Sequence, residues 1–146
     1  MHRPRPHRSS AGISLIEVML VLVVIGVLAA MAIPRFGTAT EQAHVDQAAA
    51  ALRSVWVAER LWWLEEHAFC GSTDELLEQR LLDRSLVEQT APFTLLIEGA
   101  SEDAFTARMM RTGSDAWSGE LVIDERGDVT GFSAGESGLH VLPPGQ

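Results

Sequence analysis

One carboxylate stands inside a long apolar stretch near the start of the chain. Glu17 is the one ionisable residue between Ile13 and Ile33. An unpaired carboxylate is costly in hydrocarbon, so Glu17 is expected either to pair with a cation or to reach water at the membrane surface. The chemistry expected of this residue is therefore ion pairing.

The stretch that carries Glu17 is long enough to cross a membrane. As a helix, residues 13–33 would be about 31 Å long, which matches the hydrocarbon core of a bilayer. Residues 1–12 contain three arginines, two prolines and no acid. By the positive-inside rule this leader stays in the cytoplasm and the rest of the chain lies outside.

Two general interpretations of this N-terminus are open. The first is a secretory signal cleaved at Ala30-Met31-Ala32, which would leave Ile33 as the new terminus. Its apolar region would be unusually long and would carry a carboxylate. The second is an uncleaved signal anchor, which suits the length and the flanking charges but gives no reason for Glu17. In both cases the chain would be a secreted or membrane-tethered binding domain.

A third interpretation rests on a family resemblance. The run Gly12-Ile13-Ser14-Leu15-Ile16-Glu17-Val18, between a basic leader and an apolar helix, resembles the processing signal of type IV pilins and type II secretion pseudopilins. The resemblance implies that a prepilin peptidase cleaves after Gly12 and methylates the amino group of Ile13. The apolar segment would then be retained. Ile13 departs from the family's usual Phe, and Pro34 falls where many members kink the first helix.

The resemblance gives Glu17 a cationic partner. Cleavage after Gly12 would create an α-amino group on Ile13, four residues before Glu17. In a staggered bundle, the amine of a neighbouring subunit could reach Glu17 instead and set the axial register. The implied partners are the prepilin peptidase, other pilin or pseudopilin subunits, an inner-membrane assembly platform and membrane lipid.

The other reactive residue types form no constellation that predicts an enzyme. His44, His67 and His140 fit no metal-ligand spacing, and no phosphate-binding loop is present. Cys70 stands alone and is interpreted as a lipidation site, a partner for an intermolecular disulfide or a small buried residue at a helix end. We expect no enzymatic activity, no cofactor and no metal.

Charge and an acidic turn give further limits. The formal charge is −9 over 146 residues, and because the leader carries three arginines, the chain that follows it carries −12. Such a surface repels phosphates, so no nucleic-acid partner is expected. Asp124, Glu125 and Asp128 lack the ligand spacing of a calcium loop and are expected to form a hairpin tip, with Gly127 in the turn.

Helical periodicity resumes beyond Pro34 and Gly37, where we expect a kink or a short loss of helix. From Thr38 to His67, apolar residues recur every three, four or seven positions, which predicts an amphipathic helix. Ser72 and Glu75 predict a capping box that opens a short helix on the surface of a sheet. Three tryptophans crowd the end of the long helix, and the sequence leaves open whether one of them is exposed or all are buried: Trp56, Trp62 and Trp63.

Strand-like patterns follow from residue 91 onward. Four short runs rich in β-branched, aromatic or other apolar residues are separated by Gly, Ser and Asp clusters and predict an antiparallel meander: Phe93–Glu98, Ala104–Met110, Gly119–Ile123 and Val129–Phe132. The tail after Ser133 is rich in Gly and Pro and is expected to be irregular.

These patterns predict an α+β fold in which a long N-terminal helix packs on a four-stranded antiparallel sheet, as in pilins. The expected parts are a removed leader at 1–12, a transmembrane and assembly helix at 13–36, and a soluble head at 37–146. The predicted function is that of a structural subunit, held in the inner membrane and then assembled into a surface pilus or a periplasmic pseudopilus through its N-terminal helix.

Overall fold

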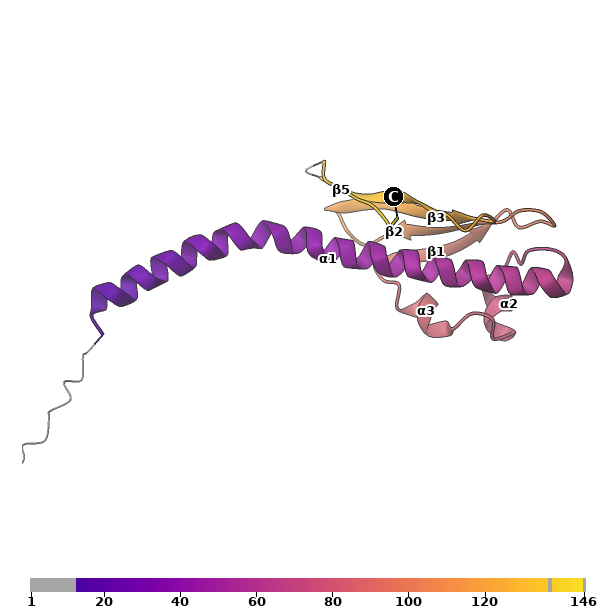
Figure 1. Cartoon of the computed structure of the whole chain (residues 1–146), viewed down its shortest axis with the longest axis horizontal. Coiled ribbons are helices and arrows are strands. Elements are labelled where there is room, and N and C mark those ends of the chain that lie inside the picture. Colours follow the sequence, from indigo (N-terminus) through magenta and orange to yellow (C-terminus); the bar gives the residue numbers. More distant parts are fainter. Residues whose placement is uncertain (1–12, 137, 146) are drawn as a thin grey trace, which may run out of the picture. The chain divides into compact units, whose positions relative to one another are not determined.

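The computed structural model describes residues 13–136 and 138–145, with residues 32–35 described by their backbone alone. The chain divides into two compact units, Met1–Phe36 and Gly37–Gln146; the second is called the head below. The elements in chain order (Figure 1) are α1 Leu15–Glu66, α2 Thr73–Glu78, α3 Arg84–Glu88, β1 Phe93–Glu98, β2 Thr106–Arg111, β3 Trp117–Asp124, β4 Val129–Gly135 and β5 His140–Val141.

Helix α1 begins at a backbone turn and continues through the expected break. The carbonyl of Ser14 accepts hydrogen bonds from the amides of Glu17 and Val18, at 3.0 and 3.2 Å. Pro34 and Gly37 both lie inside the helix, so the expected loss of helix there is wrong. An interior proline removes one backbone donor and costs about 3 kcal/mol, which a helix of 52 residues can sustain. A kink at Pro34 stays a prediction.

In the head, α1 presents one buried stripe to the sheet. Its members recur every three or four residues, the spacing that places side chains on one helical face: Glu41, Val45, Ala48, Leu52, Val55 and Glu59. The apolar members confirm the amphipathic helix predicted from the sequence. The two glutamates at the ends of the stripe were not predicted to be buried.

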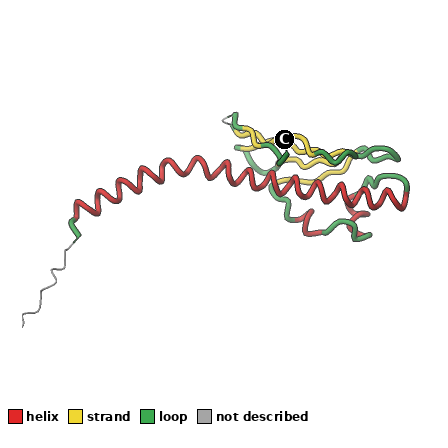
Figure 2. The backbone as a smooth tube through the Cα atoms, in the orientation of Figure 1, coloured by secondary structure: helices red, strands yellow, loops and turns green. Residues whose placement is uncertain are grey.

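The sheet is an antiparallel meander of five strands in the order β1-β2-β3-β4-β5 (Figure 2). The prediction of four strands is therefore one short. The additional strand, β5, has two residues, and it pairs Val141 with Ser133 and His140 with Ala134 of β4. A two-residue strand in a tail rich in Gly and Pro leaves too little alternation to be recognised in the sequence.

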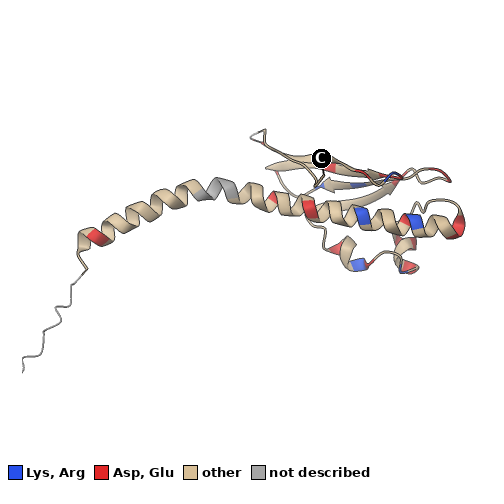
Figure 3. Cartoon of the chain, in the orientation of Figure 1, with Lys and Arg blue, Asp and Glu red and all other residues tan. Residues whose placement is uncertain are grey.

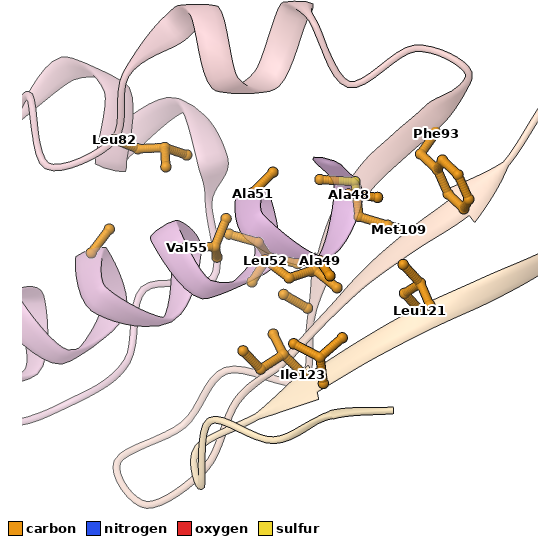
Figure 4. Packing of buried hydrophobic residues seen from close by; sticks show 14 of the residues in the cluster. Ala48, Ala49, Ala51, Leu52, Val55, Leu82, Phe93, Met109, Leu121 and Ile123 are labelled. Carbon is orange, nitrogen blue, oxygen red and sulfur yellow. The ribbon is translucent and has the colours of Figure 1, made fainter. Parts of the chain in front are cut away.

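The core lies between α1 and the inner face of the sheet (Figure 4). Leu52 and Val55 of the helix pack with Met109, Leu121 and Ile123 from neighbouring strands, and all five are almost fully buried. The strands alternate between this core and solvent, as in β1, where Phe93 and Ile97 are buried and the residues beside them are more exposed. Burial on one face of each strand fixes the register of the meander.

Two short helices connect α1 to the sheet. The N-cap half of the predicted capping box is confirmed, because the hydroxyl of Ser72 accepts from the amide of Glu75 at 3.4 Å, whereas the Glu75 carboxylate accepts from the Cys70 thiol. Figure 1 shows α2 and α3 on the side of α1 opposite the sheet, so the expected position of the short helix on the sheet is wrong. The reason is that Leu76 of α2 and Leu82 beyond it are buried in the cluster around α1.

Two tryptophans of α1 fasten loops of the sheet to the helix. The indole N–H of Trp56 donates to the carbonyl of Glu125 at 3.0 Å, and that of Trp63 donates to the carbonyl of Glu102 at 2.9 Å. The guanidinium of Arg60 lies over both rings, at 5.8 and 5.9 Å from their centroids. All three clustered tryptophans, including Trp62, are partly buried, so neither alternative left open by the sequence is met.

The hairpin between β3 and β4 requires the glycine that the sequence placed in it. Gly127 has φ of +88°, and a Cβ there would lie 2.9 Å from the Trp56 ring. Any other residue would meet both a strained backbone and the indole. The turn predicted at Gly127 is confirmed, and it also seats the hairpin on the helix.

Candidate functional site

The apolar surface of the first unit is uncovered. The large apolar side chains from Ile13 to Met31 are between 47% and 78% exposed. This segment of α1 is long and apolar enough to cross a membrane, by length and composition. Glu17 is the acidic residue of its first turn, and Figure 3 shows the start of the helix with this acidic colour.

Glu17 borders a shallow apolar hollow on the helix. The hollow has a volume of about 320 Å³ and is lined by Ile13, Glu17, Val18, Val21 and Leu22. Ile13 precedes the helix and lines this hollow together with Glu17. Among the described residues, the side chain of Glu17 makes no hydrogen bond or ion pair. The site therefore combines an exposed carboxylate, an apolar surface and the residue that would become the amino terminus.

Two of the predicted site residues have little structural description. Gly12 lies outside the described residues. Pro34 lies within α1, and its side chain is not described. The roles of Gly12, Ile13, Glu17 and Pro34 therefore stay predictions.

Comparison with known proteins gives a match in this region. Residues 7–33 match the family model described as the prokaryotic N-terminal methylation motif. The chain is 50% identical over 48 residues to the type IV narrow pilus major component PilA5 of Thermus thermophilus, which covers 31% of this chain and 41% of the relative. It is 34% identical over 71 residues to the type II secretion system core protein G of Pseudomonas aeruginosa, which covers 49% of each.

The resemblance to type IV pilins and type II secretion pseudopilins is confirmed. The chain spans less than half the length of the curated relatives it matches. The α+β architecture, with its long N-terminal helix on an antiparallel sheet, is pilin-like.

The pilin-like head contains a buried ion pair that sequence reasoning missed. Glu41, 2% exposed, accepts hydrogen bonds from Nε and Nη2 of Arg111 at 2.9 and 3.0 Å, and from the hydroxyl of Ser133 at 2.6 Å. Burial alone would raise the pKa of Glu41, but these hydrogen bonds and the charge of Arg111 outweigh it and lower the pKa. The pair ties α1 to β2 and β4.

In the described part of the chain, the second buried glutamate of the stripe has no cationic partner. Glu59 is fully buried, and its Oε2 accepts from the amide of Cys70 at 2.7 Å. Its Oε1 has no hydrogen-bond partner among the described residues. Burial raises the pKa of Glu59 to about 7, against the opposing effect of the Cys70 hydrogen bond. Both glutamates fall at apolar positions of the helical stripe, and this pattern is the signal that could have identified them.

Cys70 is a buried free thiol. Its Sγ donates to the carbonyl of Ser72 and lies 3.4 Å from the Glu75 carboxylate. Burial raises the pKa of the Cys70 thiol to about 11, so the thiolate is suppressed. Of the three alternatives for this residue, burial at a helix end is the one that the structure shows.

The remaining residue types that could bind a metal do not gather at one place in the described residues. Within residues 13–136 and 138–145, no group of three or more His, Cys, Asp or Glu side chains could hold a metal ion. In the acidic hairpin, the carboxylate of Asp124 accepts from the amide of Arg126 at 3.0 Å, which is a turn contact.

Proposed function

We propose that this chain is a structural subunit of a type IV pilus or a type II secretion pseudopilus. A prepilin peptidase cleaves it after Gly12 and methylates Ile13, and the inner membrane holds it until assembly. The observation that carries the proposal is the N-terminal methylation motif at residues 7–33, placed on a helix with an uncovered apolar surface.

The uncovered surface supports both stages of this proposal. Removing apolar surface from water is favourable by roughly 25 cal/mol of free energy per Å². Before assembly, residues 13–31 therefore favour lipid over water. In a filament, the same surface packs against copies of itself or related subunits. Contacts between two different faces of the helix build a helical filament when the rotation between subunits does not close a ring.

Glu17 sets the register between subunits in this proposal. Its side chain has no partner among the described residues and borders the hollow that Ile13 also lines. A free α-amino group on the Ile13 of a neighbouring subunit would supply the missing cation. The pair forms only at one axial stagger, because a misplaced subunit leaves a carboxylate in apolar surroundings.

The termini of the mature protein test the processing step. The chain is expressed with and without a prepilin peptidase, and membranes are analysed by intact mass and N-terminal sequencing. The expected product begins at methylated Ile13 and appears only when the peptidase is present. A product that begins at Ile33 would indicate a secreted domain, and a retained leader would indicate a plain anchor.

The Glu17→Ala variant tests the assembly step. It is expected to insert and be cleaved nearly as the parent, because the apolar segment is intact, and to yield few filaments by electron microscopy. Glu66→Ala, which removes an exposed acid from the other end of α1, is the matched control and should assemble normally. Normal filaments from Glu17→Ala would contradict the register argument.

A further inference from the structure

We propose that the carboxyl group of Glu59 is a pH-sensitive latch, which holds the loop between α1 and α2 on the helix while protonated and releases it when ionised. The loop consists of residues 67–72. The inference is independent of filament assembly, because it concerns the head alone.

The loop is held by the buried side chains of Phe69 and Cys70 and by a few hydrogen bonds, one of which ends on Glu59. The amide of Cys70 donates to Glu59 at 2.7 Å inside the core. On either side, the amide of His67 donates to the carbonyl of Trp63 at 2.9 Å, and that of Phe69 donates to the carbonyl of Ser101 at 2.8 Å. The hydrogen bond from the Cys70 amide therefore connects this loop to Glu59, a side chain of the buried stripe.

The second oxygen of Glu59 makes the latch sensitive to ionisation. Oε1 is buried and has no partner among the described residues. A neutral carboxyl group tolerates this, whereas a carboxylate with a single donor retains most of its desolvation cost. Hydration of the carboxylate then requires local opening, and the loop whose amide contacts Oε2 is the segment that we expect to open.

No cation faces Glu59 within the described residues. The loop carries the thiol of Cys70, whose amide contacts Glu59, and His67, whose ring lies against Trp63 with centroids 5.8 Å apart, while Glu75 is the carboxylate of α2 beside Cys70. On α1, the guanidinium of Arg60 lies over the rings of Trp56 and Trp63.

The arginines of the sheet are committed to other carboxylates. Arg111 pairs with Glu41, and Arg108 pairs with Glu98 and Glu120, while Arg126 lies beside Glu125. An ionised Glu59 therefore gains no compensating charge from α1, from the loop, from α2 or from the strands.

Linkage gives the size and the pH range of the effect. An opened loop exposes Glu59 to water, where its pKa is near 4.5, whereas the closed form has a pKa of about 7. Loop opening should therefore increase between pH 5 and pH 8, by roughly 50-fold, and level off above pH 8.

The test is amide hydrogen exchange of the full chain in detergent micelles, followed at Cys70 from pH 5 to pH 9. Rates are divided by those of the Glu59→Gln variant at the same pH, which cancels the intrinsic pH dependence. The glutamine keeps the shape and the acceptor of the neutral carboxyl group. The ratio is expected to rise by roughly 50-fold and then level off. A ratio that stays constant across this range would overturn the proposal.

Glu75→Gln is the matched control, because it neutralises the other acid near Cys70. This variant should retain the full pH dependence. A titration of the Glu59 carboxyl carbon by NMR gives a second readout that needs no variant, and a midpoint near that of an exposed glutamate would also overturn the proposal. Loss of the pH dependence in Glu75→Gln would assign the switch to that residue instead.

Discussion

Glu41 and Glu59 occupy equivalent positions at the two ends of one helical stripe, but their pKa values are shifted in opposite directions. They are eighteen residues apart, which is five turns of α1, so both side chains point beneath the sheet. Glu41 meets an arginine and a hydroxyl, and its pKa falls. Glu59 meets one backbone amide, and its pKa rises to about 7. Burial is common to both, so the partner decides the charge.

The comparison separates two uses of a buried acid. At Glu41 the carboxylate joins α1 to β2 and β4, and its removal leaves Arg111 without its partner in the interior. At Glu59 the neutral form closes a loop, and ionisation works against the fold. An ion pair therefore stabilises the Glu41 end of the stripe, whereas a neutral carboxyl group stabilises the Glu59 end.

The largest expected effect comes from breaking the charged end. Arg111→Met should lower the free energy of unfolding by about 3–5 kcal/mol, because it leaves the Glu41 carboxylate buried and unpaired. Denaturant unfolding of the full chain in micelles, followed by tryptophan fluorescence, measures this, since all four tryptophans lie in the head. Arg84→Met, which removes an exposed pair with Glu88, should change little. Equal losses in both variants would contradict the comparison.

The second effect has the opposite sign and depends on pH. Above pH 7, Glu59→Gln should raise the free energy of unfolding by about 2–3 kcal/mol relative to the parent, because ionisation of the buried Glu59 destabilises the folded parent. The raised pKa means that the parent loses stability as the pH increases from about 4.5 to about 7. Below this range the two proteins should be equally stable. Unfolding curves of both proteins at pH 4.5 and pH 8 test this prediction. A difference in the free energy of unfolding that is the same at both pH values would refute the role given to Glu59.

A smaller effect is expected from the hydroxyl that supports Glu41. Ser133→Ala removes a hydrogen bond of 2.6 Å to a buried carboxylate and should cost about 1.5–2 kcal/mol. Ser118→Ala, on an exposed position of β3, serves as the control in the same unfolding assay. A neutral Ser133→Ala variant would mean that Arg111 and His44 satisfy Glu41 without the hydroxyl.

The smallest expected effect is the acid limb of the stability profile. The lowered pKa of Glu41 stabilises the fold above its unfolded pKa, and this contribution is lost as the pH falls below about 4.5. The slope should stay under about 1.4 kcal/mol per pH unit. Glu41→Gln should flatten this part of the profile, although the variant is less stable at every pH. An unchanged slope would show that other carboxylates cause the loss of stability at low pH.

Periodicity predicted much of the fold. The stripe of α1, the run Phe93–Glu98 and the turn at Gly127 follow from spacing and residue type, and the structure contains each of them. The predicted ends of the strands were less accurate. For example, β3 begins at Trp117 and β4 continues to Gly135. The five residues of α3 and the two of β5 depend on tertiary packing and a local cap, which short patterns do not show.

The candidate sites differed in how far the sequence could define them. The apolar segment with Glu17 is a local pattern, so its residues could be identified from the chain alone. The Glu41–Arg111 pair joins residues 70 positions apart, and the latch joins Glu59 to a backbone amide. A helical pattern shows that an acid lies on the buried face, but only the fold shows what it meets there.

The attachment of residues 141–144 to α1 has a consequence for synthesis. Gln42 donates to the carbonyl of Leu142 and Arg53 to that of Pro144, while Val141 and Pro143 complete the core. These contacts join residues that are 91 to 100 positions apart. A chain that is made N-terminus first therefore presents the stripe of α1 well before the segment that packs beside Gln42 and Arg53 is available. The apolar part of the stripe therefore has to wait for the last residues of the head before its burial is complete.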